Sequence, residues 1–260
     1  MSVSAQPKKF AWERRRDLLQ HVRTRGSATI AELASLVGAS PVTIHRDLEL
    51  LTSQGQLVRV HGGALAVDLS DDPPASRERG ERVSQKQAIA QAAVAMVDDK
   101  VSSVFLEGST TVARLAPLLR NLEDKVILTN SPEIAMEVVQ GEAEVLLIGG
   151  FLRRRTLSTV GSSAIQMLSS VSIDLAFVGV SALDADGLSS MNSVEADTKS
   201  AIIRAAARSV ALGDGSKLGR RALVPVAPLA SLEALITDAG AAASELSALR
   251  NRGLDIIVAN

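Results

Sequence analysis

A hydroxyl-rich loop stands between a short apolar run and a helical pattern near the middle of the chain. In this loop Glu107 and Gly108 precede Ser109, Thr110 and Thr111. The free N–H groups at the start of a helix, together with Ser and Thr hydroxyls, form a site for anions such as phosphate. The same pattern is also typical of an ordinary strand-to-helix turn with a capping hydroxyl. The loop by itself is consistent with either interpretation.

Similar polar residues follow the other apolar runs of this region. They are Asn130, Gly149, Gly150, Ser181, Asn192, Glu195, Lys199, Asp214 and Lys217. Taken singly, the paired glycines form a turn, Asp214 with Lys217 is a surface ion pair, and the arginines at 153–155 are a solvated or interface run. Taken together, glycine-rich loops, hydroxyls and lysines suit a small, phosphorylated, hydroxyl-rich ligand. Their convergence at one edge of a predicted sheet favours a binding site.

Carboxylates near these loops allow a second kind of chemistry. Glu107, Asp184 or Glu195 could abstract a proton next to a carbonyl group, with Lys199 or Lys217 stabilising the enediolate. A sugar-phosphate isomerase or deaminase is therefore the alternative to a binding protein.

Residues 29–64 have the layout of a unit that enters a DNA groove. They predict two short helices, the second a reading helix, followed by a glycine-tipped hairpin. Thr29 and Glu32 form a capping box, and Gly38 ends the first helix. Ser40 caps the second helix, with Pro41 at its first position.

The second helix has an apolar stripe of Ile44, Leu48 and Leu51, and Gly55 closes it. The β-prone runs 57–60 and 64–67 then form a wing around a glycine turn. The residues expected to contact DNA are Thr29, Ser40, Val42, Thr43, His45, Arg46, Glu49, Arg59, His61, Gly62 and Gly63. An ordinary helical hairpin with solvated charges is the alternative.

Positive charge is concentrated in the N-terminal part. Residues 1–66 hold nine Lys/Arg and five Asp/Glu, a net charge of +4, and the rest holds 19 and 24, a net charge of −5. This asymmetry favours phosphate contact by the N-terminal unit. For the run at 14–16, phosphate contact and a solvated basic face both stay open.

Apolar runs of strand length alternate with helical patterns from residue 83 onward. The runs are 103–106, 126–128, 145–148, 175–178, 210–212, 235–237 and 256–258, and the helical patterns are 83–97, 111–119, 132–139, 162–169, 195–208 and 242–252. This alternation predicts a doubly wound, mainly parallel α/β sheet with helices on both faces. Ligands of such sheets bind beyond the carboxyl ends of the strands, where the polar loops fall.

Paired prolines and mixed charge at 68–82 indicate a linker. The predicted organisation is therefore a DNA-binding domain at 10–67, the linker, and an α/β domain at 83–260.

The composition excludes several classes of protein. The chain has 260 residues, of which 46% are hydrophobic, ample for a core, yet no uncharged apolar run predicts a membrane span. The N-terminus lacks the apolar stretch of a signal peptide, so we expect a cytoplasmic protein with no membrane partner. There is no cysteine, and His21, His45 and His61 are too scattered for a zinc site, so no metal or cofactor is expected. Aromatic residues make up 2%, which argues against a stacking platform for single strands.

The N-terminal segment resembles the DeoR-type winged helix-turn-helix. That family's signature is an Arg with apolar residues four and eight positions on, then a small residue, Thr, an apolar residue, Arg or His, a basic residue, Asp and an apolar residue. The matching residues are Arg14, Leu18, Val22, Ser40, Thr43, Ile44, His45, Arg46, Asp47 and Leu48. The stretch 60–64 is similar to the family's wing. His45 departs slightly, because Arg is commoner there; His keeps a donor without a permanent charge.

The rest of the chain resembles the sensor domain of DeoR/GlpR-type regulators, which is related in fold to ribose-5-phosphate isomerase. The similar stretches are 105–111, 128–130, 148–150, 160–161, 174–177, 195–199, 213–217 and 236–238. The resemblance implies a sequence-specific repressor of a carbohydrate-metabolism operon, released from double-stranded operator DNA by a phosphorylated sugar. It also implies a homo-oligomer, a dimer or tetramer.

The chain departs from the family pattern at three points. Glu107 stands where the family usually has Asp, and Ser109-Thr110-Thr111 stands where it usually has Gly-Thr-Thr. Ala182-Leu183-Asp184 replaces a common Gly-Ile-Asp step. The phosphate end of the site is therefore better supported than the sugar end. The related isomerase's acidic catalytic loop is not visible at 179–184, which disfavours turnover. A constitutive architectural DNA binder would leave the hydroxyl and lysine loops without a purpose.

Overall fold

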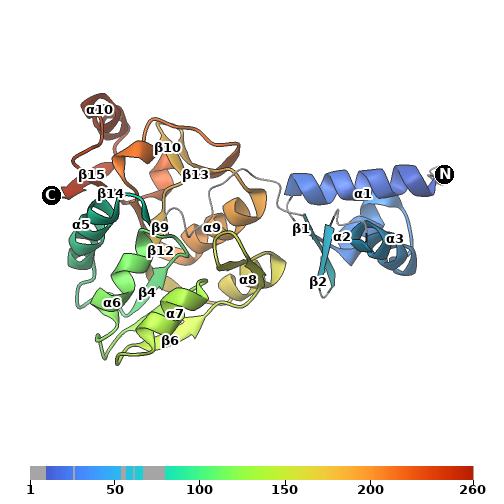
Figure 1. Cartoon of the computed structure of the whole chain (residues 1–260), viewed down its shortest axis with the longest axis horizontal. Helices are drawn as coiled ribbons and strands as arrows, with labels where there is room; N and C mark the ends of the chain where they lie inside the picture. The colour runs from blue at the N-terminus through green and yellow to red at the C-terminus, as the bar shows by residue number, and fades with distance from the viewer. Residues whose placement is uncertain (1–9, 26, 54–56, 61, 67–79, 260) are drawn as a thin grey trace, which may run out of the picture. The chain divides into compact units, whose positions relative to one another are not determined.

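The computed structural model describes residues 10–25, 27–53, 57–60, 62–66 and 80–259. It comprises two compact units, Met1–Leu69 and Ser70–Asn260 (Figure 1). Each unit has a hydrophobic core of its own. Of the predicted linker, residues 68–79 lie outside the described residues.

The elements of the first unit are α1 (Ala11–Arg25), β1 (Ser27–Thr29), α2 (Ile30–Val37), α3 (Pro41–Ser53), β2 (Leu57–Val60) and β3 (Gly63–Ala66). Helix α2 begins and ends at its predicted caps, and α3 begins at its predicted cap, Ser40. The Thr29 hydroxyl accepts the N–H of Glu32, and the Glu32 carboxylate accepts the N–H of Thr29, which confirms the capping box. Gly38 ends α2 in the left-handed conformation at φ 63°, as predicted.

A small antiparallel sheet in the order β1-β3-β2 completes this unit. The wing hairpin is confirmed, although β3 starts one residue earlier than predicted; Gly55, His61 and Val67 lie outside the described residues. Strand β1 was not predicted, because three residues are too few to show alternation. A Cβ on Gly63 would clash with the backbone carbonyl of Ala28, so only glycine lets β3 pair this closely with β1.

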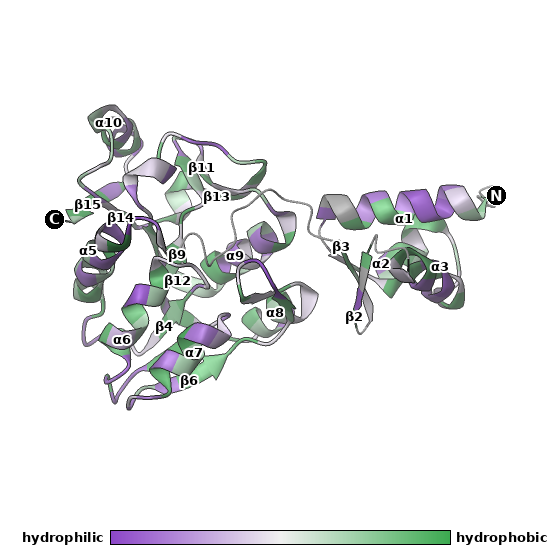
Figure 2. Ribbon diagram, in the orientation of Figure 1, coloured by the Kyte–Doolittle hydropathy of each residue, from purple (hydrophilic) through white to green (hydrophobic). Residues whose placement is uncertain are grey.

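Seven parallel strands form the central sheet of the second unit, and all seven predicted runs lie in it. They are β4 (Ser103–Leu106), β5 (Val126–Thr129), β6 (Glu144–Leu147), β9 (Ile173–Gly179), β12 (Ala206–Leu212), β14 (Ala234–Asp238) and β15 (Asp255–Ala259), in the order β15-β14-β12-β9-β4-β5-β6. Because both faces are covered, the strands are apolar almost throughout. Strands β4 and β6 are green in Figure 2, whereas α5 and α7 carry both purple and green.

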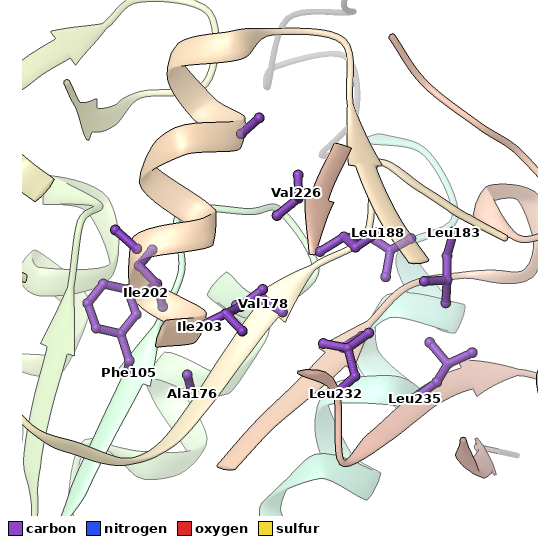
Figure 3. Close-up of a cluster of buried hydrophobic side chains, with 14 of the residues drawn as sticks. Phe105, Ala176, Val178, Leu183, Leu188, Ile202, Ile203, Val226, Leu232 and Leu235 are labelled. Carbon is purple, nitrogen blue, oxygen red and sulfur yellow. The ribbon is translucent and has the colours of Figure 1, made fainter. Parts of the chain in front are cut away.

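Two sets of helices cover the two faces of this sheet. One face packs on α5 (Val83–Ala93), the short η2 (Val112–Leu115) and α6 (Ala116–Leu119), and α7 (Pro132–Val138). The other packs on α8 (Ser162–Leu168), α9 (Ser193–Ala205) and α10 (Ala243–Asn251). Figure 3 shows Ile202 and Ile203 of α9 beside Phe105 and Val178 of the sheet. The predicted doubly wound architecture is therefore confirmed.

Smaller elements were not predicted. A hairpin of β7 (Phe151–Arg153) and β8 (Ser158–Val160) follows β6, and a second sheet joins β10 (Ala182–Asp184), β11 (Gly187–Ser190) and β13 (Val224–Pro228). The short 3-10 turns are η1 (Val94–Met96), η3 (Gly215–Lys217) and η4 (Leu229–Ser231). The helix predicted at 195–208 ran too far, because β12 begins at Ala206. No helix among the described residues is long and apolar enough to span a bilayer.

Candidate DNA-binding surface and ligand cavity

The two faces of α3 differ in character. Ile44, Leu48 and Leu51 are buried in the core of the first unit, as the predicted stripe requires. On the opposite face Val42 is 67% exposed and Arg46 is exposed as well. A helix with this distribution can enter the major groove and turn its early residues toward base edges.

A partly buried ion pair joins α3 to α1. The Nε atom of Arg14 lies 2.6 Å from a carboxylate oxygen of Asp47, and that of Arg15 lies 3.7 Å from the other oxygen. Asp47 is only 6% exposed. Arg14 is thus engaged inside the unit, whereas Arg16 is exposed. The pair orients α3, a role that the signature positions did not reveal in the sequence.

The remaining predicted DNA contacts lie at helix starts and at the wing turn. The Ser40 side chain accepts the N–H of Thr43 at 3.3 Å, so both residues belong to the cap of α3. Thr29 has the same role at α2. Gly62 is exposed with φ 83°, while Gly63 is buried against β1.

Arg59 of the wing strand contacts two side chains of α3 that lie one helical turn apart. Its two terminal nitrogens lie 2.5 Å from Nδ1 of His45 and 2.7 Å from a carboxylate oxygen of Glu49. These three predicted DNA contacts therefore form one network on the surface of the first unit.

In the second unit the order of the strands creates a crevice between β4 and β9. From β4 the chain proceeds through β5 to β6, then returns to β9 on the other side of β4 and continues to β12. Ligands of doubly wound sheets bind at such a reversal, beyond the carboxyl ends of the strands. A cavity of about 700 Å³ lies there. The predicted ligand residues that line it are Glu107, Gly108, Ser109, Thr110, Thr111, Ser181, Glu195, Lys199 and Lys217.

The other predicted ligand residues do not line the cavity. Gly149 and Gly150 follow the edge strand β6, two strands away from the reversal. Asn130 is buried, accepting the N–H of Gly108 at 2.8 Å and donating to the carbonyl of Thr159. Asn130 thus positions the hydroxyl-rich loop from behind.

Asn192 and Asp214 are helix caps. Asn192 accepts the N–H groups of Val194 and Glu195, both at 3.1 Å, at the start of α9. Asp214 is 2% exposed and lies 3.5 Å from Arg82, so it is not the exposed partner of Lys217 that the sequence suggested.

The hydroxyl-rich loop offers fewer amides than a complete anion cradle. Asn130 takes the amide of Gly108, and Ser109 and Val112 donate within the loop to Glu107 and to the Ser109 hydroxyl. Among the described residues, the amides of Thr110 and Thr111 are left available. Lys86, which is 4% exposed, donates to the Thr110 hydroxyl at 3.0 Å and also lines the cavity.

A buried ion pair supports the inner wall of the cavity. Lys199 Nζ lies 3.4 Å from the Glu107 carboxylate and donates to the carbonyl of Gly179 at 2.6 Å. The other Glu107 oxygen accepts the N–H of Gly179 at 3.0 Å. A Cβ on Gly179 would clash with Ser109, so glycine allows the loop after β4 to meet the end of β9.

A second ion pair corrects the interpretation of one residue of the arginine run, Arg153, whereas Arg154 is exposed as predicted. Arg153 is 4% exposed and pairs with Glu195, so it is neither solvated nor an exposed interface residue. The hairpin of β7 and β8, which the sequence did not predict, directs it inward.

Burial raises the pKa of Glu195 above its ordinary value of 4.5. The charges of Arg153 and Lys199 and a hydrogen bond from Thr156 act against burial, and the charge of Glu107 acts with it. The folded state therefore binds more protons than the unfolded state between pH 4.5 and the raised folded pKa. The stability that the folded protein gains from proton binding at Glu195 is fully present below pH 4.5. It is lost as the pH rises from 4.5 to the raised folded pKa.

We expect Glu195→Gln to reduce this pH dependence, because glutamine still accepts from Arg153 but does not ionise. Urea unfolding of both proteins at several pH values from 4.5 upward measures the pH dependence of the free energy of unfolding. The wild-type protein should lose stability relative to the variant as the pH rises. Parallel curves would contradict the assignment.

Several residues that line the cavity were not predicted. Lys86 and Arg114 are single cations within helical patterns, and Thr156 and Arg220 stand in irregular segments. The only available signal was that Lys86 shares a face with Ile89, Ala90 and Ala93, which are buried. The lining holds five cations, Lys86, Arg114, Lys199, Lys217 and Arg220, against the four carboxylates of Glu107, Glu133, Glu137 and Glu195.

Two family models match the chain. A DeoR-like helix-turn-helix domain covers residues 14–69, and a DeoR C terminal sensor domain covers residues 81–239. The HTH-type transcriptional regulator GlpR of Haloferax volcanii is 35% identical over 94% of this chain and 96% of its own length. The glycerol-3-phosphate regulon repressor of Escherichia coli K12 is 28% identical over 94% and 97%. A ribose 5-phosphate isomerase A structure from Methanocaldococcus jannaschii matches 51% of this chain and 52% of its own, with 20% identity and a TM-score of 0.38, too low to bear on function.

Proposed function

The chain belongs to the DeoR family of DNA-binding transcriptional regulators, and from this we propose that it is a repressor released from its operator by a small phosphorylated sugar. The observation that carries the proposal is the cavity at the strand reversal, where two free amides, hydroxyls and an excess of cations converge. One relative is named for a glycerol-3-phosphate regulon, which is consistent with a phosphorylated effector.

The phosphate group is assigned to the Thr110 and Thr111 amides and to Lys86 and Lys217. Amides at the start of a helical segment and lysine side chains are the usual protein partners of phosphate. The sugar hydroxyls are assigned to the inner wall, where Glu195 and Ser181 line the cavity.

The start of α5 supports a route from the cavity toward the DNA-binding unit. Lys86 contacts the loop after β4, and Arg82, one turn earlier, pairs with Asp214 in the loop after β12. Both loops line or flank the cavity, so a bound phosphate changes the contacts of the first helix that follows the linker. A ligand shifts DNA affinity only through such a difference between states, typically worth about 1–3 kcal/mol.

We further propose that two or more copies assemble through their second units, as a dimer or tetramer in the cytoplasm. A symmetric assembly places reading helices in successive major grooves of a repeated operator. We assign no turnover to the cavity; conversion of ribose 5-phosphate or glucosamine 6-phosphate by the pure protein would overturn this.

Matched variants test the division of labour. Lys217→Ala is expected to bind operator normally but to lose sugar-phosphate affinity by roughly tenfold or more, because it removes a charge-assisted contact. Arg46→Ala should lose operator affinity and keep its sugar-phosphate binding. A thermal-shift screen against sugar phosphates, followed by operator binding with and without the hit, gives both readouts; a saturating ligand at 100 times its Kd adds about 2.7 kcal/mol.

A normal response in Lys217→Ala would remove Lys217 from the site. Loss of both activities in Arg46→Ala would contradict the separation of the two functions.

A further inference from the structure

The network of Arg59, His45 and Glu49 constrains the chemistry of the reading helix. Arg59 belongs to β2, whereas His45 and Glu49 lie one turn apart on α3. The Arg59 guanidinium lies 2.5 Å from Nδ1 of His45 and 2.7 Å from the Glu49 carboxylate. A strand outside the reading helix therefore holds a side chain that the helix presents.

The contact selects one tautomer of the neutral His45 ring. A guanidinium has five N–H donors and no acceptor, so His45 must accept through Nδ1. A neutral imidazole with a lone pair on Nδ1 carries its hydrogen on Nε2. His45 then offers one donor, at Nε2, and its remaining acceptor is occupied.

Glu49 keeps Arg59 in place. Its carboxylate is 63% exposed and compensates the charge of the guanidinium, whose side chain is 34% exposed. With Glu49 and Arg59 paired, their expected role shifts from direct base contact to support of His45.

We propose that Arg59 is a positioning residue that presents His45 to the major groove as a single hydrogen-bond donor. This rests on the proposed reading role of the outward face of α3. Guanine, adenine and thymine each show an acceptor on their major-groove edge, whereas cytosine shows only its N4 amino donor. The protein therefore rejects cytosine at the one base position that His45 meets.

Sequence selection from a randomised library tests this with the full chain. His45→Ala identifies the position, because its preference disappears there. Arg59→Met and Arg59→Lys, which keeps the charge but lacks the fork, are expected to relax the same position, reducing the cytosine penalty from roughly tenfold to a few-fold. Arg16→Met, the same change at an exposed residue of α1, should leave base preferences unchanged.

Imidazole nitrogen NMR gives a second readout without DNA. The chain has three histidines, so His45→Ala assigns the signals. In wild type His45 should show a hydrogen-bonded, unprotonated Nδ1 and a protonated Nε2, and Arg59→Lys should shift the Nδ1 signal. A protonated Nδ1 in wild type would overturn the proposal.

Two binding outcomes would also overturn it. Arg59 variants that weaken all sequences equally would make Arg59 a phosphate contact, and loss of preference at a position that His45→Ala leaves intact would make it a direct reader. A wild-type protein that selects no sequence would refute the reading role of α3 itself.

Discussion

Lys199→Met is expected to destabilise the second unit by about 3–5 kcal/mol, the usual cost of leaving one partner of a buried ion pair alone. The Lys199 and Glu107 side chains are 7% and 10% exposed, so water cannot solvate the Glu107 carboxylate once the Lys199 ammonium group is removed. The variant also removes the bond to the Gly179 carbonyl, which joins the end of β9 to α9. Response to sugar phosphate should be lost with it.

Urea unfolding of the full chain measures this prediction. Lys100→Met, the same change at an exposed lysine, is the matched control and should cost little. The double variant Glu107→Gln with Lys199→Met should recover part of the loss, because no charge is then left buried. A cost for Lys199→Met that is no larger than the control would show that the pair is not buried in solution.

Gly63→Ala is expected to abolish operator binding while leaving sugar-phosphate binding intact. The new Cβ would clash with the backbone carbonyl of Ala28, and backbone in a paired strand cannot move aside as a flexible side chain can. Overpacking typically costs about 1–3 kcal/mol, and more against backbone, so β1 should separate from β3 and the wing should lose its position.

The neighbouring glycine is the control. A Cβ on Gly62 meets nothing within 4 Å, so Gly62→Ala carries only the conformational cost of φ 83°, about 1 kcal/mol. Operator binding and sugar-phosphate stabilisation are measured on both variants. Equal operator affinities for the two would contradict the close approach of β1 and β3.

Local signals in the sequence determined most elements of this protein. The capping box at Thr29 and the glycine after α2 act within one helical turn, so their residue types suffice to place the helix ends. The seven strands of the sheet were also predictable, because burial on both faces requires continuous apolar runs. The hydroxyl-rich loop was found for the same reason, since it follows such a run directly.

Elements that depend on distant partners were not predictable. Strand β1 exists because β3 approaches it, and the hairpin of β7 and β8 has too few residues to show a period. In the second sheet β11 pairs with β13 across about 40 residues of chain, which no local pattern records.

The tertiary structure alone decided which predicted residues meet. The sequence placed polar loops at one edge of the sheet, but the reversal between β4 and β9 brings the loops of β4, β9 and β12 together and leaves Gly149 and Gly150 apart. It also decided the partners of the charges: Arg14 with Asp47, Arg153 with Glu195, and Arg59 with His45. Backbone preferences and apolar runs are local patterns of a few residues, so they can be read in the sequence. Ion pairs and cavities join residues that lie far apart in the sequence, so they follow only from strand order and packing.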